Sequence, residues 1–192
     1  MKVQTLSISN FKTHKGVSYD SIELHYHQFG QAIGNAPVVL VNHSLTGDSI
    51  VCGEKGWWNE IIGEGQTIDT NHYTILAFNI PGNGFDGNEQ NLIQNYHDFT
   101  AKDVAGIFWE GLFHLQVNEV FSLIGGSLGG GIAWEMANLE PNKIQNLIQA
   151  INEKESETKS LSEGDLITLD GSTGKILSGA TKLIEPELGG NF

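Results

Sequence analysis

Residues 122–131 read SLIGGSLGGG, an apolar run that breaks into five glycines around Ser127. The segment EVFSLIGG (119–126) is apolar and rich in β-formers, which is typical of a buried strand. The segment LGGGIAWEMANLEP (128–141) follows at once and predicts a helix that Pro141 stops. That helix should pack on the sheet through three apolar side chains at helical spacing: Ile132, Met136 and Leu139. The stretch therefore predicts a buried strand that turns at Ser127 directly into a helix.

The glycines around Ser127 match the pattern G-x-S-x-G over residues 125–129. In this pattern the serine lies in a strained turn, where flanking side chains would collide with the neighbouring strand and helix. The turn lifts the hydroxyl into solvent and directs the Leu128 N–H towards an oxyanion at the helix N-terminus. We interpret Ser127 as a nucleophile, and the alternative is a glycine turn that only permits close packing. A dinucleotide fingerprint would need glycine in place of Ser127, and no lysine follows as in a P-loop.

A second oxyanion donor is expected in the loop after an earlier strand. That loop is NHSLTG (42–47), after VVLV, and either Leu45 or Ser44 could supply the N–H. His43 could act as a base, although a histidine in such a loop more often shapes it by hydrogen bonding. The turn-rich segment PGNGFDG (81–87) could border a pocket, since open α/β sheets bind ligands at their strand ends.

Strand-like and helix-like segments alternate along the first 150 residues. Apolar β-branched runs at 36–44 and 73–82 predict buried parallel strands, and 141–150 predicts the start of another strand. The segment 99–117 is apolar at helical spacing with Thr100 as N-cap, and 56–70 predicts a short helix and loop. A half-exposed strand is expected at 21–30, with one apolar face made of Ile22, Leu24, Tyr26 and Phe29. This order predicts an α/β fold, with a mostly parallel sheet covered by helices on both faces.

The net charge of −13 over 192 residues argues against nucleic acid and anionic membranes as partners, and leaves a small molecule as the expected ligand. All ten basic residues are lysine, so the chain lacks the arginine fork that usually captures carboxylates and phosphates. No apolar run has membrane-spanning length, and the first residues lack a secretory pattern, so a cytoplasmic protein is expected. Cys52 is the only cysteine and is expected to act as a small hydrophobic side chain. The pair His25-x-His27 lacks a third ligand, so no metal site is expected.

A change in composition near residue 150 divides the chain into 1–149 and 150–192. Only one of the seventeen aromatic residues, Phe192, and none of the seven histidines lie after this point. The polar segment 151–164 predicts a linker or exposed loop. The segment DLITLDGSTGKIL (165–177) predicts a β-hairpin around an Asp-Gly turn. We therefore expect a short tail that contains a hairpin.

Over about residues 20–149 the chain resembles the homoserine O-acetyltransferases, which are acyltransferases with the α/β-hydrolase fold. The segments that carry the resemblance are VNHSLTGDS, GWW, YTILAFNIPGNGFDG and IGGSLGGGIAWEMA. The resemblance implies that Ser127 accepts an acetyl group from acetyl-CoA and passes it to the homoserine hydroxyl, with no bound cofactor. It also implies that the oxyanion N–H groups belong to Leu45 and Leu128, and it places the protein in methionine biosynthesis.

The family's triad follows the order Ser, Asp, His, and this sequence has no histidine after Ser127. Asp165 and Asp170 lie in the dissimilar tail and are not assigned to the triad. We therefore expect an incomplete α/β-hydrolase sheet with impaired acyl transfer. One alternative is a weak serine esterase. A second is a truncated or chimeric fragment without catalysis, which could self-associate through an exposed sheet edge. A third is a site that Asp and His from another chain complete.

The tail, residues 151–192, resembles a segment of pyruvate phosphate dikinase that lies just after the phosphohistidine domain. The strings that carry this resemblance are INEKE, EGDLITLDGSTGKI and EPELGGNF. The family's phosphorylated histidine has no counterpart here, so no functional residue is transferred. The two resemblances together predict a junction of two unrelated fragments near residue 150.

Overall fold

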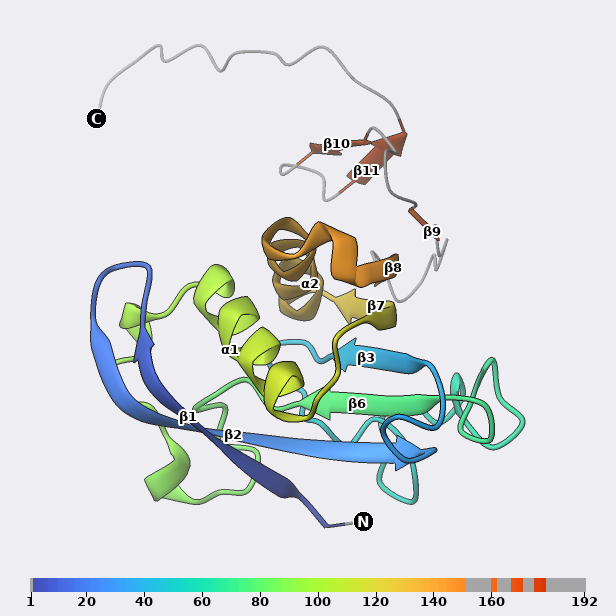
Figure 1. The fold of residues 1–192 in the computed structure, drawn as a ribbon, viewed down its shortest axis with the longest axis horizontal. Helices are drawn as coiled ribbons and strands as arrows, with labels where there is room; N and C mark the ends of the chain where they lie inside the picture. Colours follow the sequence, from blue (N-terminus) through green and yellow to red (C-terminus); the bar gives the residue numbers. More distant parts are fainter. Residues whose placement is uncertain (1, 151–159, 162–166, 171–174, 179–192) are drawn as a thin grey trace.

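The computed structural model describes residues 2–150, 160–161, 167–170 and 175–178. In this part of the chain the main sheet has the strand order β1-β2-β6-β3-β7-β8-β9 (Figure 1). Its strands are β1 (Gln4–Lys12), β2 (Ser18–Gly30), β3 (Val38–Asn42), β6 (Thr74–Phe78), β7 (Val120–Gly126), β8 (Ile144–Ala150) and β9 (Ser160–Leu161). Strands β6, β3, β7 and β8 are parallel, whereas β1, β2 and β9 pair antiparallel. The predicted mostly parallel α/β sheet is confirmed.

Two helices, α1 (Ala101–His114) and α2 (Leu128–Leu139), pack on the same face of the sheet (Figure 1). Short 3₁₀ turns η1 (Glu89–Asn91), η2 (Tyr96–Asp98) and η3 (Pro141–Lys143) precede or follow them. The helices share one apolar core with alternate residues of the strands. Its members include, from the strands, Leu24, Leu40, Leu76, Phe78 and Leu123, and from the helices, Ile107, Phe108, Leu112, Ile132 and Met136. Leu139, expected in this core, is exposed, and Ala133 is buried instead.

The start of α1 is fixed by a capping box, as its sequence predicts. The Thr100 hydroxyl accepts the Asp103 N–H at 3.4 Å, and the Asp103 carboxylate accepts the Thr100 N–H at 2.8 Å. The same carboxylate accepts the His14 N–H at 2.6 Å, which ties α1 to the turn between β1 and β2. Burial raises the pKa of Asp103, but these hydrogen bonds outweigh it, and the pKa is lowered overall.

The other face of the sheet is covered by turns within residues 49–73, and no helix of the described residues lies there, so the expectation of helices on both faces is wrong for this part of the chain. The predicted helix in 56–70 is therefore wrong: this segment holds turns and the two-residue strands β4 (Ile62–Gly63) and β5 (Ile68–Asp69). Glycines at 53, 56, 63 and 65 disfavour a helix here. The segment still buries apolar side chains, Cys52 among them as predicted, in a second core: Phe29, Val39, Val41, Val51, Cys52, Ile62, Ile75, Ala77 and Ile124.

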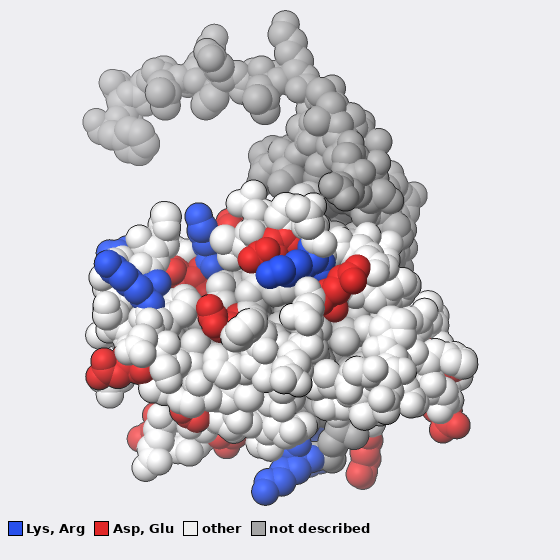
Figure 2. All heavy atoms as spheres, in the orientation of Figure 1, with Lys and Arg blue, Asp and Glu red and all other residues white. Residues whose placement is uncertain are grey.

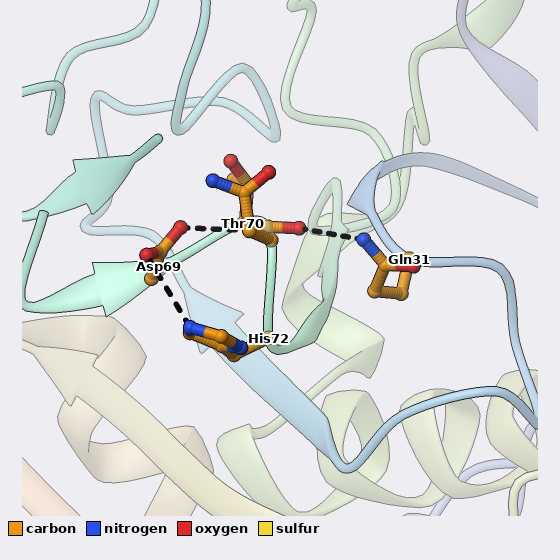
Figure 3. Close-up of polar contacts among 5 residues, drawn as sticks. Gln31, Asp69, Thr70 and His72 are labelled. Carbon is orange, nitrogen blue, oxygen red and sulfur yellow. Dashed lines mark hydrogen bonds and ion pairs between the residues drawn. The ribbon is translucent and has the colours of Figure 1, made fainter. Parts of the chain in front are cut away.

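The turn after β5 holds this covering segment against the end of β2 (Figure 3). The Asp69 carboxylate accepts the Asn71 N–H at 2.8 Å and lies 3.8 Å from His72 Nε2. The Thr70 carbonyl accepts the Gln31 side-chain amide at 3.3 Å. These contacts hold the turn before β6 against the residue after β2, at the opposite end of the parallel strands from Ser127.

The amino-terminal strand β1 is not part of the sequence prediction, although Ile8 is buried in the first core. It pairs antiparallel with β2 along almost its whole length. In β2, Ile22, Leu24 and Tyr26 share one face as predicted, but Phe29 packs on the other face beside His27. An odd-numbered residue of a strand faces away from its even-numbered neighbours, which explains the difference.

In the tail, β10 (Ile167–Asp170) and β11 (Lys175–Ser178) pair antiparallel as the sequence predicts. The expected Asp-Gly turn extends into residues 171–174, which lie outside the described residues. Strand β9 falls in the segment expected to be a linker, and it adds an antiparallel strand beside β8. On the molecular face shown in Figure 2, acidic and basic side chains are interspersed rather than gathered by sign.

Candidate active site

Ser127 occupies the single position between the end of β7 and the start of α2. Its backbone has φ 53° and ψ −126°, a conformation that non-glycine residues rarely adopt. The side chain is exposed and makes no capping hydrogen bond to α2. Strained residues of this kind concentrate at functional sites, and the strain here presents the hydroxyl to solvent at the carboxyl end of the strand.

The glycines next to Ser127 allow the strand, the helix and a neighbouring loop to approach closely. A Cβ on Gly125 would overlap the backbone of Gly129. A Cβ on Gly129 would overlap the carbonyl groups of Asn42 and His43, at the end of β3. The N-terminus of α2 therefore lies directly against the loop after β3, and only residues without a side chain fit at these two positions.

The loop after β3 brings a second backbone segment beside the start of α2. The Gly47 N–H donates to the Ser44 carbonyl at 3.0 Å, which closes a tight turn with Leu45 at its tip. Leu45 is 71% exposed although it is apolar. Leu128 is the first residue of α2, so its N–H has no acceptor within the helix.

His43 cross-links this loop to the loop after β6. Its Nδ1 lies 2.6 Å from the Ser44 carbonyl, and its Nε2 accepts the Ile80 N–H at 3.0 Å. The side chain is 1% exposed, and burial lowers the pKa of His43, so the ring is neutral at pH 7. Because both ring nitrogens are engaged, His43 is not available as a base for Ser127, and the expectation that it shapes the loop is confirmed.

A buried polar network continues from His43 beneath the site. Asn83 donates to the Gly47 carbonyl at 3.4 Å and to the Asn79 side chain at 3.3 Å. Asn79 in turn donates to Ser49 Oγ at 2.8 Å and accepts the Ser49 N–H at 3.0 Å. Ser49 Oγ lies 2.7 Å from Nδ1 of buried His27. Asn79 and Asn83 were not assigned a role by the sequence interpretation; the only signal for Asn79 is a polar residue directly after an apolar strand, and Asn83 lies in the turn-rich segment 81–87.

A cavity of about 420 Å³ opens at the carboxyl ends of the strands, beside the turn that holds Ser127. Its walls come from the loop after β3, the loop after β6, η2 and the starts of α1 and α2: Leu45, Ile80, Pro81, Gly82, Asn83, Ile93, Tyr96, Phe99, Thr100, Ala101, Val104, Leu128 and Ile132. The prediction that the segment 81–87 borders a pocket is confirmed for its first three residues, 81–83. Leu45 and Leu128, the two expected oxyanion donors, both line it.

Residues 37–161 match the family model described as alpha/beta hydrolase fold. The chain belongs to the α/β hydrolase fold family. It is 31% identical to a homoserine O-acetyltransferase of Methanocorpusculum labreanum over 69% of this chain and 30% of that protein. The crystal structure of a homoserine O-acetyltransferase from Staphylococcus aureus superimposes with a TM-score of 0.67 and 30% identity, over 77% of this chain and 46% of that one.

The crystal structure of esterase E22 shows the same fold, with a TM-score of 0.69, 21% identity, and cover of 81% of this chain and 49% of that one. The chain thus spans less than half the length of these relatives. The expected resemblance to homoserine O-acetyltransferases is confirmed. The range that matches the α/β hydrolase family, 37–161, extends past residue 150 and includes β9.

No cluster of metal ligands and no membrane-spanning helix is found in the part of the α/β hydrolase-fold chain that the structure describes. There, no three His, Cys, Asp or Glu side chains are grouped as metal ligands would be. His25 and His27 bond instead to different partners, Thr5 Oγ1 and Ser49 Oγ. No helix of the described ranges has both the length and the apolar character needed to cross a membrane.

The two buried histidines of this α/β hydrolase fold make its stability depend on pH. Burial lowers the pKa of both His27 and His43 from the ordinary value of 6.5. Below pH 6.5 the unfolded chain therefore binds more protons than the folded chain, so the free energy of unfolding falls as the pH decreases towards the folded pKa values. Urea unfolding at a series of pH values measures this free energy, and we expect it to decrease from about pH 8 to about pH 5.

The matched variants are His27→Gln and His43→Gln together, with exposed His97→Gln as the control. The double variant should show a shallower decrease between about pH 7 and pH 5, because glutamine does not titrate. The control should keep the slope of the unmodified protein. An unchanged slope in the double variant contradicts the assignment.

Proposed function

We propose that this chain forms an acyl-serine at Ser127 and passes the acyl group to a hydroxyl, as an O-acyltransferase of the homoserine O-acetyltransferase type. The observation that supports this function best is the strained turn at Ser127, beside a cavity at the carboxyl ends of the strands. The sequence similarity to homoserine O-acetyltransferases supports acetyl-CoA as the acyl donor and homoserine as the acceptor. A cytoplasmic role in methionine biosynthesis belongs to the same proposal.

In the proposed reaction Ser127 Oγ bonds to the acyl carbonyl carbon, and the bond from that carbon to the leaving oxygen or sulfur breaks. The serine proton ends on the leaving group. In the second step the acceptor oxygen bonds to the acyl carbon, the bond from that carbon to Ser127 Oγ breaks, and the proton of the acceptor hydroxyl returns to the serine. The backbone N–H groups of Leu45 and Leu128 stabilise the oxyanion, since both residues line the cavity beside Ser127.

We propose that turnover is slow, because no histidine is hydrogen-bonded to Ser127 in the part of the chain that the structure describes. His43 uses both ring nitrogens within the fold, and no histidine follows Ser127 in the sequence. A missing general base costs about 10²–10⁴-fold in rate. Under such conditions water can replace the hydroxyl acceptor, which would make the protein a weak serine esterase.

The organisation of the chain remains a proposal as well. We propose residues 1–149 as the amino-terminal part of an α/β-hydrolase domain and 150–192 as a tail that resembles a dikinase fragment. Association of copies through a sheet edge stays a prediction, and so does completion of the site by another chain.

The proposed acyl-serine is tested by incubating the protein with p-nitrophenyl acetate and measuring intact mass. We expect the mass of one acetyl group to be added, and peptide mapping to place it on Ser127. The variant Ser127→Ala should gain no acetyl group, while exposed Ser9→Ala should behave as the unmodified protein. Equal acetylation of Ser127→Ala and the unmodified protein would remove Ser127 from the reaction, and no acetylation of either supports the non-catalytic alternative.

A further inference from the structure

A second cavity, of about 320 Å³, lies between β2 and the segment 90–95, and we call it the outer groove. One wall is formed by residues 19 and 21–23 of β2, and the other by residues 81–82 and 90–95. Pro81, Gly82 and Ile93 also line the cavity beside Ser127, so the two cavities adjoin at these residues. No step of the proposed acyl transfer involves the outer groove.

The backbone of β2 directs hydrogen-bonding groups into this groove. Strand β6 pairs with β2 only at residues 26–30, and the ladder ends with the Asn79 N–H, which donates to the His25 carbonyl at 2.8 Å. Backbone groups of an antiparallel strand point alternately to its two neighbours. The odd-numbered residues of β2 therefore face the β6 side, and the even-numbered residues face β1. Of the odd-numbered residues, Ser21 and Glu23 lie beyond the end of β6 and line the groove.

The outward backbone groups of Ser21 and Glu23 have no partner in the part of the chain that the structure describes. A row of such groups along a strand edge is a template for a further strand.

The opposite wall offers the side chains of Gln94 and Asn95, which make no hydrogen bond within the described residues. Asn95 directly precedes η2, yet its side chain does not cap that turn. Carboxamides donate as well as accept hydrogen bonds, so these two can bond to the second edge of a chain that lies along β2.

The other side chains in the walls indicate what such a chain would carry. Glu23 has the one charged side chain among the described residues that line the groove. The net charge of −13 repels acidic peptides and attracts basic ones. Leu92 also lines the groove and is 46% exposed, so it offers apolar surface to a neighbouring side chain. The groove therefore favours a peptide with basic and apolar side chains.

We propose that the outer groove binds an extended peptide, which adds a short strand to the free edge of β2 at Ser21 and Glu23. The main chain of the peptide bonds to β2 along one edge and to the carboxamides of Gln94 and Asn95 along the other. A lysine of the peptide pairs with the Glu23 carboxylate. The inference is independent of the proposed function, because it involves no reaction at Ser127.

Amide hydrogen exchange, measured by NMR on the full chain, tests the free edge directly. Without peptide, the amides of Ser21 and Glu23 should exchange at least about tenfold faster than those of Ile22 and Leu24, which face β1. Equal protection of the two pairs would mean that the edge of β2 is already occupied, and it overturns the proposal. Saturation with the capped pentapeptide Thr-Val-Lys-Val-Thr should slow exchange at Ser21 and Glu23 and leave Ile22 and Leu24 unchanged.

N-methylated forms of the same peptide test strand addition on the unmodified protein. Methyl groups on both valine nitrogens block one edge of the extended peptide, and methyl groups on the lysine and threonine nitrogens block the other. At least one of the two forms should bind about tenfold more weakly or worse, since it loses two or more backbone hydrogen bonds. Binding of both forms as tightly as the unmodified peptide overturns the proposal.

The matched protein variants are Ser21→Pro and Ser9→Pro. Proline lacks the N–H but is tolerated in a strand where that N–H is outside the ladder. Ser21→Pro should weaken peptide binding by about tenfold or more. Ser9, the partner of Ser21 in the register, directs its N–H to the outer edge of β1, so Ser9→Pro should bind normally. Glu23→Lys should weaken binding by about two- to fivefold, because the peptide lysine then meets a like charge.

Unchanged binding by folded Ser21→Pro contradicts the proposal, and if circular dichroism shows this variant to be unfolded, the N-methylated peptides decide. Absence of any peptide binding overturns it as well. Maltose that shifts the amide signals of Ser21 and Glu23, where the pentapeptide does not, would assign the groove to a saccharide instead.

Discussion

Replacement of Gly129 by alanine is expected to destabilise the protein by about 3 kcal/mol or more. The new methyl group would overlap the carbonyl oxygens of Asn42 and His43. These are backbone atoms at the end of a buried central strand, so they cannot rotate away as a side chain would. Relief requires that α2 moves off the loop after β3, which also separates Leu45 from Leu128. Urea unfolding gives the stability, and acylation by p-nitrophenyl acetate gives the state of the site.

Gly131→Ala is the matched control, in the same turn of α2. No heavy atom lies within 4 Å of a Cβ built at Gly131. Alanine there should stabilise the helix by about 0.5–1 kcal/mol, because glycine loses more backbone entropy than alanine on folding. A Gly129→Ala protein that is as stable as Gly131→Ala would show that the close approach at the end of β3 is not required.

Replacement of His43 by leucine is expected to destabilise the protein by about 2–4 kcal/mol. Leucine has similar bulk but accepts no hydrogen bond, so the Ile80 N–H loses the acceptor that it has at 3.0 Å. The Asn83 amide, 3.5 Å from the same ring nitrogen, loses a contact as well. The loops after β3 and β6 would then be free to separate, and the cavity between them would lose its shape.

Two measurements check this expectation. Urea unfolding of His43→Leu should show the loss of stability, whereas exposed His97→Leu should stay within about 0.5 kcal/mol of the unmodified protein. Acylation of Ser127 by p-nitrophenyl acetate should slow in His43→Leu and not in His97→Leu. Unchanged stability and acylation in His43→Leu would mean that the cross-link between the loops contributes little.

The sequence predicts the parts of the fold that depend on local patterns. The strand–serine–helix unit at 119–141, the buried strands β3 and β6, and the Thr100 cap of α1 all follow from residue types that act within a few positions of each other. The sequence predictions are wrong or incomplete where packing between distant segments decides the secondary structure. The segment 56–70 covers a sheet face without a helix, and β1 forms because β2 is there to pair with it.

The candidate site divides in the same way. Ser127, Leu128 and the loop with Leu45 are recognisable in the sequence because glycine patterns mark tight turns. The sequence favours a loop-shaping role for His43 without naming its partners, and it gives no role to Asn79 or Asn83, because an asparagine near a strand end fits equally with exposure, catalysis or internal hydrogen bonding. Only the distances show that these side chains bond to one another and to the loops.

By itself, the sequence determined the turn at Ser127, because a backbone that passes from strand to helix in one residue needs glycines on both sides. It also determined the absence of arginine, and with it one limit on ligand chemistry. The tertiary structure alone decided that His43 is neutral and fully engaged, and that an apolar cavity opens beside Ser127. Both depend on burial by segments far apart in the chain, and burial is set by packing rather than by any local pattern.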